Sequence, residues 1–485
     1  MKQFTCILAF LFLQINSFSQ DMLGSVLGNY AGINSLQLNP SALLNSKIYF
    51  DIRLIGSNVF IDNNAIYLSK DDYRFSNFFT PGYEFPSHKE TYGTEDRYFY
   101  MYDNTKPKNA FINIQINGPG AMMIWRHHAF AINTAIRTVF SMRKIPYDIA
   151  NFALRGLNYL PQHNIAYNDD TPFLGSGMVW SEIGLAYAYT IYAEGNDKIS
   201  AGINIKRLYS AGGIFINVDH MDYTALNDST MDIRSLTLDA GLSLPLNYSS
   251  NEFEMDPIIK GKGFGLDIGL TYTRLSPHHQ KQYFSTACSQ QYENYIYRLG
   301  LALIDFGGIR FNDNAEKLKI DNKPAFWEHL NRFDFSNIQK FLDTVSYKFY
   351  QDTTSLYADN KFFIFLPTTL SFQFDYHIKN NWFINASFLY GLNMGKQSIV
   401  RPSQISITPR YESEWFEASF PVSLYDFTWP RVGASLRFYG FTIGTDNLGG
   451  FFSWKDFTGL DFYFSVRYFI LAGKCRNIKI PMACP

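Results

Sequence analysis

The residue types that most often carry chemistry are scattered along this chain, and their spacing forms no familiar reactive site. His127-His128 and His278-His279 are adjacent pairs, and neighbours on a strand point to opposite faces, so one ion is not held by both members of a pair. The sequence has no Cys-x-x-Cys, His-Glu-x-x-His or Gly-x-Ser-x-Gly motif. We therefore predict no enzyme, no metal site and no cofactor.

One glycine run resembles a phosphate loop at first sight. Gly261, Gly263 and Gly265 form a G-x-G-x-G run. A phosphate loop needs a helix N-terminus after the glycines, whereas the pattern of a strand continues on both sides of this run. We interpret the three glycines as small residues of a strand or turn.

Apolar and polar residues alternate with a period of two along much of the chain, which indicates that strands position these residues. In residues 362–378 one face is almost wholly apolar, and the other carries Gln373 and Asp375. Such alternation is typical of a strand with one face in an apolar medium. Similar runs occur at residues 48–54, 182–191, 236–244, 264–273, 382–390 and 460–470. The polar faces, which suit a wet interior, include Asp51, Arg53, Glu182, Asp267, Gln373, Asp375 and Arg467.

The N-terminus indicates export. Residues 1–19 show a charged start, an apolar run over residues 4–13 and the small-residue exit Ser17-Phe18-Ser19, which is the order of a cleavable signal peptide cut after Ser19. A signal anchor is the alternative, but this run is shorter than a spanning helix. No other apolar stretch reaches membrane-helix length, so a membrane form must cross with strands. We predict an outer-membrane protein.

Strand and connection lengths favour a membrane barrel over a soluble β-sandwich. The alternating runs reach ten or more residues, as tilted membrane strands need. Tight turns near residues 126–128, 194–198 and 379–381 alternate with long outer loops at residues 69–108, 144–175, 219–230, 276–294 and 321–361. We predict an all-β, antiparallel transmembrane β-barrel of about 14 strands, or 16 if residues 109–125 and 430–448 are each two strands.

Two of the outer loops have helical spacing, at residues 147–160 and 324–350. These short helices either cap the mouth of the barrel or form an apolar vestibule for a ligand or partner.

The predicted organisation has four parts. They are a signal peptide (1–19), an N-terminal segment (20–46), the barrel (47–471) and a basic periplasmic tail (472–485). The three mature cysteines are too few for a disulfide framework, although Cys475 and Cys484 are close enough in sequence to form a bridge. Free thiols are the alternative.

The segment before the first strand has too many turn formers for a strand and too much leucine for a solvent-exposed tail. Its Asn39-Pro40-Ser41 resembles the Asn-Pro-Ala element of FadL-like barrels, which include hydrophobic-compound transporters and the PorV shuttle. Longer stretches, such as residues 366–392 and 430–470, are similar to an uncharacterised outer-membrane family of the Bacteroidota. The resemblance implies 14 strands and a hatch in the lumen that contains these three residues. Ser41 in place of Ala and the basic tail depart from the pattern.

Three functions compete on these grounds. The leading hypothesis is a passive outer-membrane channel or transporter for hydrophobic or amphipathic small molecules, surrounded by outer-membrane lipid. A sealed barrel that docks an envelope protein or takes part in secretion is the alternative, and an outer-membrane lipid hydrolase is a third. A net charge of -1 gives no reason to expect a nucleic-acid partner.

Overall fold

The computed structural model describes residues 22–471, except 75–76, 78–79, 81, 85, 90–95, 255, 278–293 and 331–336. The predicted signal peptide, the C-terminal tail with Cys475 and Cys484, and His278-His279 lie outside the described residues.

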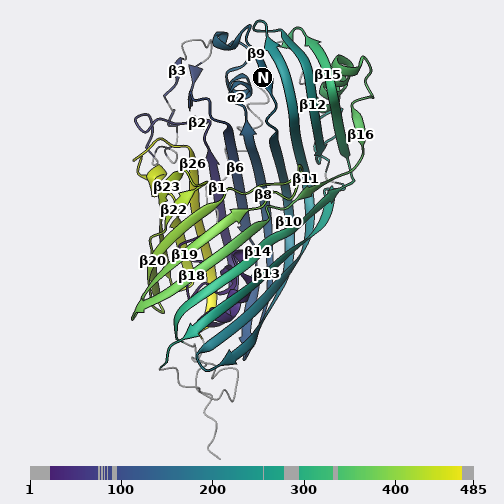
Figure 1. The fold of residues 1–485 in the computed structure, drawn as a ribbon. Coiled ribbons are helices and arrows are strands. Elements are labelled where there is room, and N and C mark those ends of the chain that lie inside the picture. Colours follow the sequence, from purple (N-terminus) through teal and green to yellow (C-terminus); the bar gives the residue numbers. More distant parts are fainter. Residues whose placement is uncertain are drawn as a thin grey trace, which may run out of the picture.

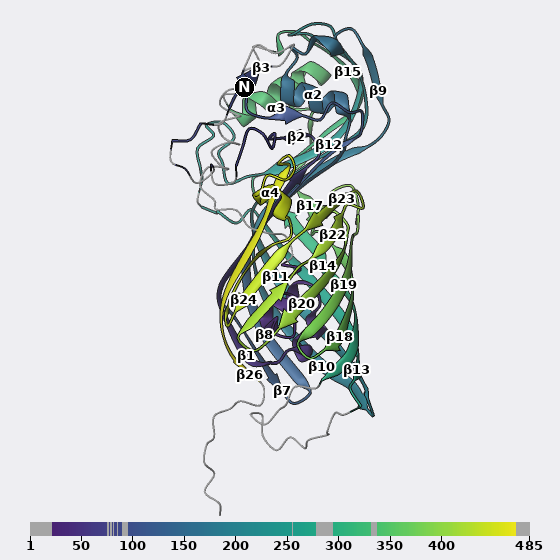
Figure 2. The ribbon, with the colours of Figure 1, turned by 90° about the vertical axis from the view of Figure 1, so that its left-hand side faces the viewer.

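A closed antiparallel barrel of 14 strands, formed by the described residues, is the body of the molecule (Figures 1 and 2). The first and last strands close it, with register partners running from Ile48↔Leu471 to Asp62↔Gly459. The predicted barrel is confirmed. In chain order its wall consists of β1 (Ile48–Asn63), β6 with β7 (Lys108–Asn117, Gly120–Trp125), β8 (His128–Ile145), β10 (Phe173–Glu194), β11 (Asp197–Ala225), β13 (Gly261–Leu275), β14 (Tyr295–Phe311), β17 with β18 (Phe362–Phe365, Thr369–Lys379), β19 (Trp382–Gly391), β20 (Gln404–Glu412), β21 with β22 (Phe416–Ser419, Val422–Tyr425), β23 with β24 (Trp429–Val432, Ala434–Phe438), β25 (Phe441–Thr445) and β26 (Gly459–Leu471).

The two regions that left the strand count open behave differently. Residues 109–125 occupy one position in the wall, interrupted at Gly118-Pro119. Residues 430–448 occupy two positions, because the chain reverses at Tyr439-Gly440. A Cβ at Gly440 would lie 1.8 Å from the Arg467 carbonyl oxygen, so only glycine fits this turn.

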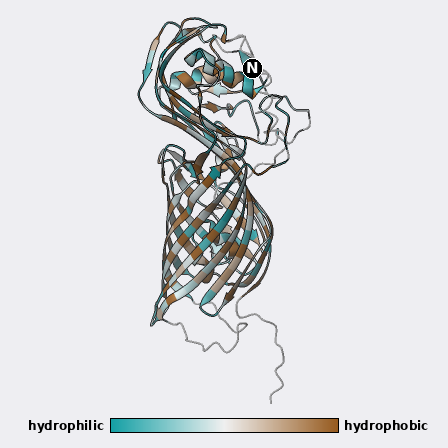
Figure 3. Cartoon of the chain, turned by 90° about the vertical axis from the view of Figure 1, so that its right-hand side faces the viewer, coloured by the Kyte–Doolittle hydropathy of each residue, from teal (hydrophilic) through white to brown (hydrophobic). Residues whose placement is uncertain are grey.

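The wall separates apolar and polar residues as the alternation predicts. On β10, Ile183 and Leu185 are 50% and 63% exposed on the outside, whereas Glu182 and Ala186 are buried. Figure 3 shows the resulting mixture of hydrophobic and hydrophilic residues along each strand. Exposed aromatic side chains gather near the end with the short turns, including Trp125, Tyr187, Trp382, Trp415, Phe438 and Tyr468.

The two ends of the barrel differ, and we call them the turn end and the crown end. The turns at residues 126–127, 195–196, 380–381 and 439–440 lie at the turn end. The outer loop predicted at residues 276–294 lies mostly outside the described residues, but the strands that flank it contradict the predicted side. Asp197, which follows a short turn, pairs with Arg274, and Leu275 pairs with Tyr295, so β13 ends and β14 begins at the turn end.

Above the barrel, a curved sheet covers two helices and forms a unit that we call the crown (Figure 2). Long strands carry the chain there: β11 pairs with β13 over residues 197–210 and with β12 over residues 213–225. The crown consists of the outer part of β11 together with β9 (Ala166–Asp169), β12 (Met231–Ser243), β15 (Ala315–Trp327), β16 (Tyr357–Asp359), α2 (Tyr147–Arg155), η4 (Leu160–Gln162) and α3 (Ile338–Tyr350).

The crown corrects several sequence predictions. Of the predicted run 236–244, residues 236–243 lie in β12, and Leu236 packs in the crown with Ile320 and Leu342 instead of facing lipid. Most of residues 219–230 and part of 321–361 are strand, and the second helix begins at Ile338 instead of near residue 324. Both helices contribute side chains to the crown core, among them Phe152 and Leu342.

The remaining elements are small and lie near the crown end. They are the strand pairs β2 (Ile66–Tyr67) with β5 (Tyr100–Met101) and β3 (His88–Lys89) with β4 (Asp96–Arg97), and the helix α4 (Leu448–Phe451). Within the described residues, every helix is too short or too polar to span a membrane.

The crown should be stabilised by acid. Burial and the neighbouring Asp148 carboxylate raise the pKa of Asp169 from 3.8 to about 6. A raised carboxyl pKa means that the folded crown holds the proton more tightly than the unfolded chain, so this contribution is complete below pH 3.8 and is lost as the pH rises through 6. We expect lower amide protection factors, which are corrected for the intrinsic pH dependence of exchange, in β9 and α2 at pH 8 than at pH 5. Asp169→Asn should remove this difference, and an unchanged difference would contradict the prediction.

The facing of the wall can be tested on β18, where Phe372 is 42% exposed on the outside. Phe372→Arg should cost about 2–4 kcal/mol of folding free energy if this face meets the centre of a bilayer. Ile378→Arg, on the same face beside the turn, should cost only about 0–1 kcal/mol. Urea titration of both variants in lipid vesicles measures this, and equal costs would contradict the assigned membrane position.

Candidate functional site

Residues 22–46, which we call the hatch, lie inside the barrel toward the turn end (Figure 2). They contribute no strand to the wall and form two short 3-10 helices, η1 (Gly32–Gln37) and η2 (Pro40–Asn45). Most of their side chains are buried, including Ile33 and Leu43, which are fully inaccessible to solvent. The hatch therefore fills the part of the lumen where it lies.

The Asn39-Pro40-Ser41 turn has a local physical cause. Asn39 is extended and caps η2, because its side-chain oxygen accepts hydrogen bonds from Ser41 N at 3.0 Å and Ser41 Oγ at 2.6 Å. Pro40 is the first residue of η2, where its missing N–H is no loss and its fixed φ suits a helix. The motif therefore stops the extended chain and starts the helix.

Apolar contacts hold the hatch on two sides. Ile33, Leu36, Leu43 and Leu44 pack with wall residues of β7, β8, β10 and β26, among them Met122. Nearer the crown end, a second cluster joins hatch and wall, formed by Met22, Leu23, Val26, Leu38, Leu389 and Tyr463. These contacts are non-directional and do not position the chain by themselves.

The path of the hatch through the lumen is set by wall side chains that hydrogen-bond to its main chain. An irregular segment cannot pair its own N–H and C=O groups, so each buried group needs a partner elsewhere. The wall supplies partners along the segment: Asp446 to Leu23 N, Ser419 to Gly24 O, Glu412 to Asn29 N, Arg467 to Tyr30 O and Ala31 O, Asp51 to Ile33 N, and Gln373 to Leu38 O.

The strongest of these ties is centred on Arg467 and Asp51. Arg467 Nη1 lies 3.0 Å from Asp51 Oδ2 and donates to Ala31 O at 2.7 Å, while its Nη2 donates to Tyr30 O at 2.9 Å. Gly32 has φ +56°, and a Cβ there would lie 2.1 Å from Asp51 Oδ2. Only glycine therefore lets the chain approach this ion pair so closely.

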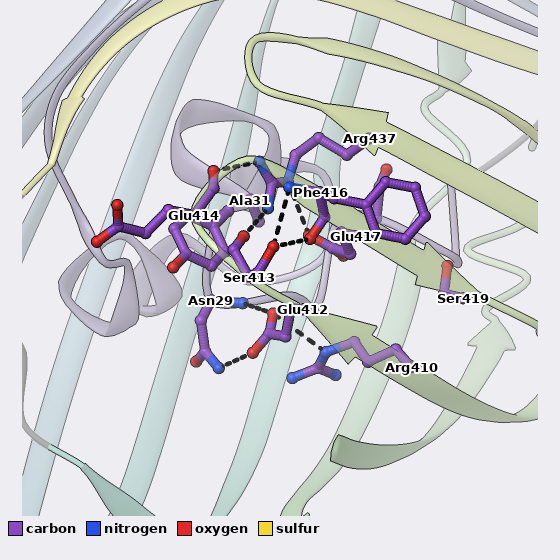
Figure 4. A network of polar contacts seen from close by, with 12 residues as sticks. Asn29, Ala31, Arg410, Glu412, Ser413, Glu414, Phe416, Glu417, Ser419 and Arg437 are labelled. Carbon is purple, nitrogen blue, oxygen red and sulfur yellow. Dashed lines mark hydrogen bonds and ion pairs between the residues drawn. The ribbon is translucent and has the colours of Figure 1, made fainter. Parts of the chain in front are cut away.

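A second network holds the start of the hatch (Figure 4). Glu412 Oε2 accepts a hydrogen bond from Asn29 N at 3.0 Å and lies 3.4 Å from Arg410 Nε, and Arg410 in turn makes a bidentate pair with Asp375 at 2.9 and 3.0 Å. These charged groups are almost inaccessible to solvent, so each depends on the others for compensation.

Arg437 extends this network on its other side. It binds Glu417 at 2.9 Å, and its guanidinium lies 4.3 Å from the centre of the Tyr30 ring. The start of the hatch therefore lies against wall arginines of both β20 and β24.

All seven polar residues predicted to face the lumen lie inside the barrel, but they have different surroundings. Asp51, Gln373 and Arg467 touch the hatch main chain, and Asp375 is linked to it through Arg410 and Glu412. Arg53 donates to Asn34 Oδ1 at 3.5 Å. Glu182 and Asp267 belong to a separate network with Arg137, Lys206 and Asp305. Sequence reasoning missed Asn29 and Glu412, although Glu412 lies on the polar face of an alternating strand.

A small polar chamber remains above the hatch. Its volume is about 60 Å³, enough for a few water molecules and far below the roughly 300–1,000 Å³ of ligand pockets. Side chains of the hatch, Arg53 and the network of Arg137 line it, among them Gln37, Glu182, Lys206 and Asp305.

Toward the crown end, an apolar cluster that we call the septum fills the lumen. Residues of eight wall strands meet Ala315 of β15 there, and the rings of Phe311 and Phe362 lie 5.0 Å apart. Its members are Phe60, Phe111, Val139, Met178, Trp180, Leu208, Phe215, Ile309, Phe311, Ala315, Phe362, Ile364, Leu366, Ile399 and Tyr425. Gly261 and Gly263 lie beneath it as strand residues, in close contact with Ile309 and Gly308. The hatch and the septum thus fill the lumen at two levels.

The wall itself is locally interrupted beside the chamber. Strand pairing between β1 and its neighbour is lost between Arg53↔Gly120 and Gly56↔Asn117. The Arg53 side chain covers the gap by donating to Gly118 O at 3.2 Å and Thr134 O at 3.3 Å. No group of three His, Cys, Asp or Glu side chains among the described residues is arranged to hold a metal ion.

Comparison with known proteins gives a family and a set of similar folds. A family model described as a family of unknown function (DUF5723) matches residues 40–446, which confirms the predicted membership of a family without an assigned activity. No curated protein sequence matches the chain. The relation to PorV and the bacterial phylum stay predictions.

Solved structures with a similar fold include transport proteins. A TodX deltaS2S3 mutant monoaromatic hydrocarbon channel shares 8% identity, with 91% of this chain and 95% of that chain covered and a TM-score of 0.40. A FadL homologue of Pseudomonas aeruginosa shares 10% identity over 94% and 98% of the two chains, with a TM-score of 0.24. At these values the likenesses assign no activity to this chain.

The fastening of the hatch can be tested at Asn29. Asn29→Ala removes hydrogen bonds to Glu412, Tyr295 and Arg298, and each buried group left without a partner costs about 1–3 kcal/mol. Amide exchange around residues 29–31 should therefore become roughly tenfold faster or more. Gln37→Ala is the control, because that side chain makes only a 3.8 Å contact with the Met22 sulfur. Equal exchange in the two variants would contradict the assigned role of Asn29.

Proposed function

Since the chain belongs to the DUF5723 family, a family of unknown function, we propose from the lumen itself that the protein is a gated outer-membrane transport barrel. It takes small amphipathic or hydrophobic molecules and is closed here by its hatch. The proposal gives the protein no enzymatic role. One observation carries the proposal. The hatch belongs to no strand of the wall, fills the lumen at the turn end and is held against the wall by noncovalent contacts.

The outer face of the wall supports a place in lipid. Large apolar side chains are exposed on successive strands, among them Leu54, Leu185, Phe264 and Leu299. A soluble protein rarely exposes so continuous an apolar surface, whereas a bilayer covers it without cost. The aromatic side chains near the turn end suit the interface between lipid and water. The predicted signal peptide would deliver the chain to the outer membrane.

Reversible closure is supported by the nature of the hatch contacts. A barrel that never opens can fill its lumen with wall side chains, as the septum does. The hatch is instead bound by wall charges such as Arg467 and Glu412, which water can also solvate. Because the same groups tolerate a wet lumen, the wall is compatible with the hatch both in place and displaced.

The lining of the path supports an amphipathic solute. The septum and the clusters around the hatch are apolar, whereas the chamber between them carries charged and amide side chains. A molecule with an apolar body and a polar head would find partners in each layer. A wholly apolar solute would have to displace water from the charges of the chamber.

Removal of the hatch tests the proposal directly. Deleting residues 21–44 removes no strand, since β1 begins at Ile48. We expect a folded barrel that still migrates faster on an unheated detergent gel. Because rotamer changes of the septum side chains are then enough to open the lumen, it should conduct more in planar bilayers and make cells more sensitive to large antibiotics. A folded deletion variant that conducts no better than the intact protein would contradict gated transport and favour a sealed docking barrel.

A further inference from the structure

Three wall glycines meet the hatch at its tightest turn. Gly202 of β11, Gly269 of β13 and Gly300 of β14 lie on neighbouring strands, and Gly202 is the register partner of Gly269. A Cβ at Gly269 would lie 2.1 Å from Asn39 Oδ1, and a Cβ at Gly202 would lie 2.4 Å from Ser41 N. Side chains at these positions are incompatible with the seated hatch.

The third glycine completes the same surface. A Cβ at Gly300 would lie 3.0 Å from Asn39 Nδ2 and 2.3 Å from Gln373 Oε1, and Gln373 itself accepts a hydrogen bond from Asn39 Nδ2 at 3.0 Å. Glycine weakens a strand interior by roughly 0.5–1 kcal/mol relative to alanine. Glycines at one spot of three adjacent strands therefore indicate close approach of another chain.

Polar contacts between the wall and the turn also depend on the residue types of the turn. Asn39 Nδ2 reaches Leu270 O at 3.3 Å, and Ser41 Oγ lies 2.6 Å from Thr271 Oγ1. Elsewhere along the hatch, bonds such as those from Arg467 go to main-chain atoms, which any sequence supplies, and side-chain bonds form at Asn29 and Asn34. The turn is thus one of the places where the wall depends on the residue types of the hatch.

We propose that the lumen wall is a peptide-binding site that recognises the hatch as a separable ligand, with the Asn39-Pro40-Ser41 turn seated in a socket formed by Gly202, Gly269 and Gly300. Its ligand class is an irregular peptide that carries an Asn-Pro turn followed by a small hydroxyl residue. The inference deepens the proposed gate and rests on it only in assuming that the hatch can leave.

The test uses the full chain, folded before it is cut. A linker with a protease site is inserted between Asn45 and Ser46, and the assembled protein is cleaved in detergent. We expect the cut hatch to remain with the barrel during gel filtration. Gly269→Ala should release it. Gly265→Ala is the matched control on the same face of the same strand, where a Cβ would meet only the Leu366 and Lys206 side chains, at 3.1 Å or more; it should retain the hatch.

Competition gives a second readout. A fluorescent synthetic peptide of residues 22–45 should exchange into the cleaved protein, and the same peptide with alanine at positions 39–41 should bind about tenfold more weakly or worse, a loss of about 1.4 kcal/mol. Equal binding of the two peptides, or equal retention in Gly269→Ala and Gly265→Ala, would overturn the socket. Loss of the cut hatch from the unsubstituted protein would overturn peptide recognition altogether.

Failure of the gate is distinguishable from failure of the socket. The conductance of the variant without residues 21–44 decides the gate. Retention of the cut peptide decides the socket. A hatch that stays bound selectively in a barrel whose deletion variant does not conduct would refute transport and leave the socket standing.

Discussion

The interior of this barrel depends on one constraint: an irregular main chain buried in a lumen must find partners for its N–H and C=O groups outside itself. The wall meets this need with charged side chains, above all Arg467, Asp51 and Glu412. Each of these charges is in turn paired with another wall residue, such as Arg410 for Glu412. The hatch main chain and the buried charges of the wall therefore stabilise each other. If the hatch leaves, water must take its place beside these charges.

This constraint gives the lumen a layered order. The hatch occupies the turn end, the polar chamber follows, and the septum closes the crown end. The two closures differ in kind. The septum consists mainly of wall side chains and opens only if they change rotamer, whereas the hatch is a separate segment that, in our proposal, moves as a unit. The crown lies beyond both, with a core of its own around α3. A molecule that crosses the barrel would therefore have to pass the packed side chains of the septum and displace the hydrogen-bonded hatch.

Alternation in the sequence was enough to predict the barrel and the facing of residues such as Asp51 and Asp375, because a period of two records which side of a strand is apolar. It could not predict the crown. The apolar face of β12 looks the same whether it meets lipid or the side chains of α3. Loop length likewise predicted the wrong side for the connection between β13 and β14, whose flanking strand ends lie at the turn end, because length alone does not indicate the side. The role of Gln373 and the glycine socket were hidden, since both depend on a partner more than 150 residues away in the chain.

A reversible tether between hatch and wall tests the central claim most directly. Ser41 Oγ and Thr271 Oγ1 lie 2.6 Å apart, so Ser41→Cys with Thr271→Cys places two thiols close enough to form a bridge. Single-channel conductance is then recorded in planar bilayers before and after addition of a reductant. A gate formed by the hatch predicts that the oxidised protein stays closed and that reduction brings opening events. Identical conductance in the two states would contradict the account.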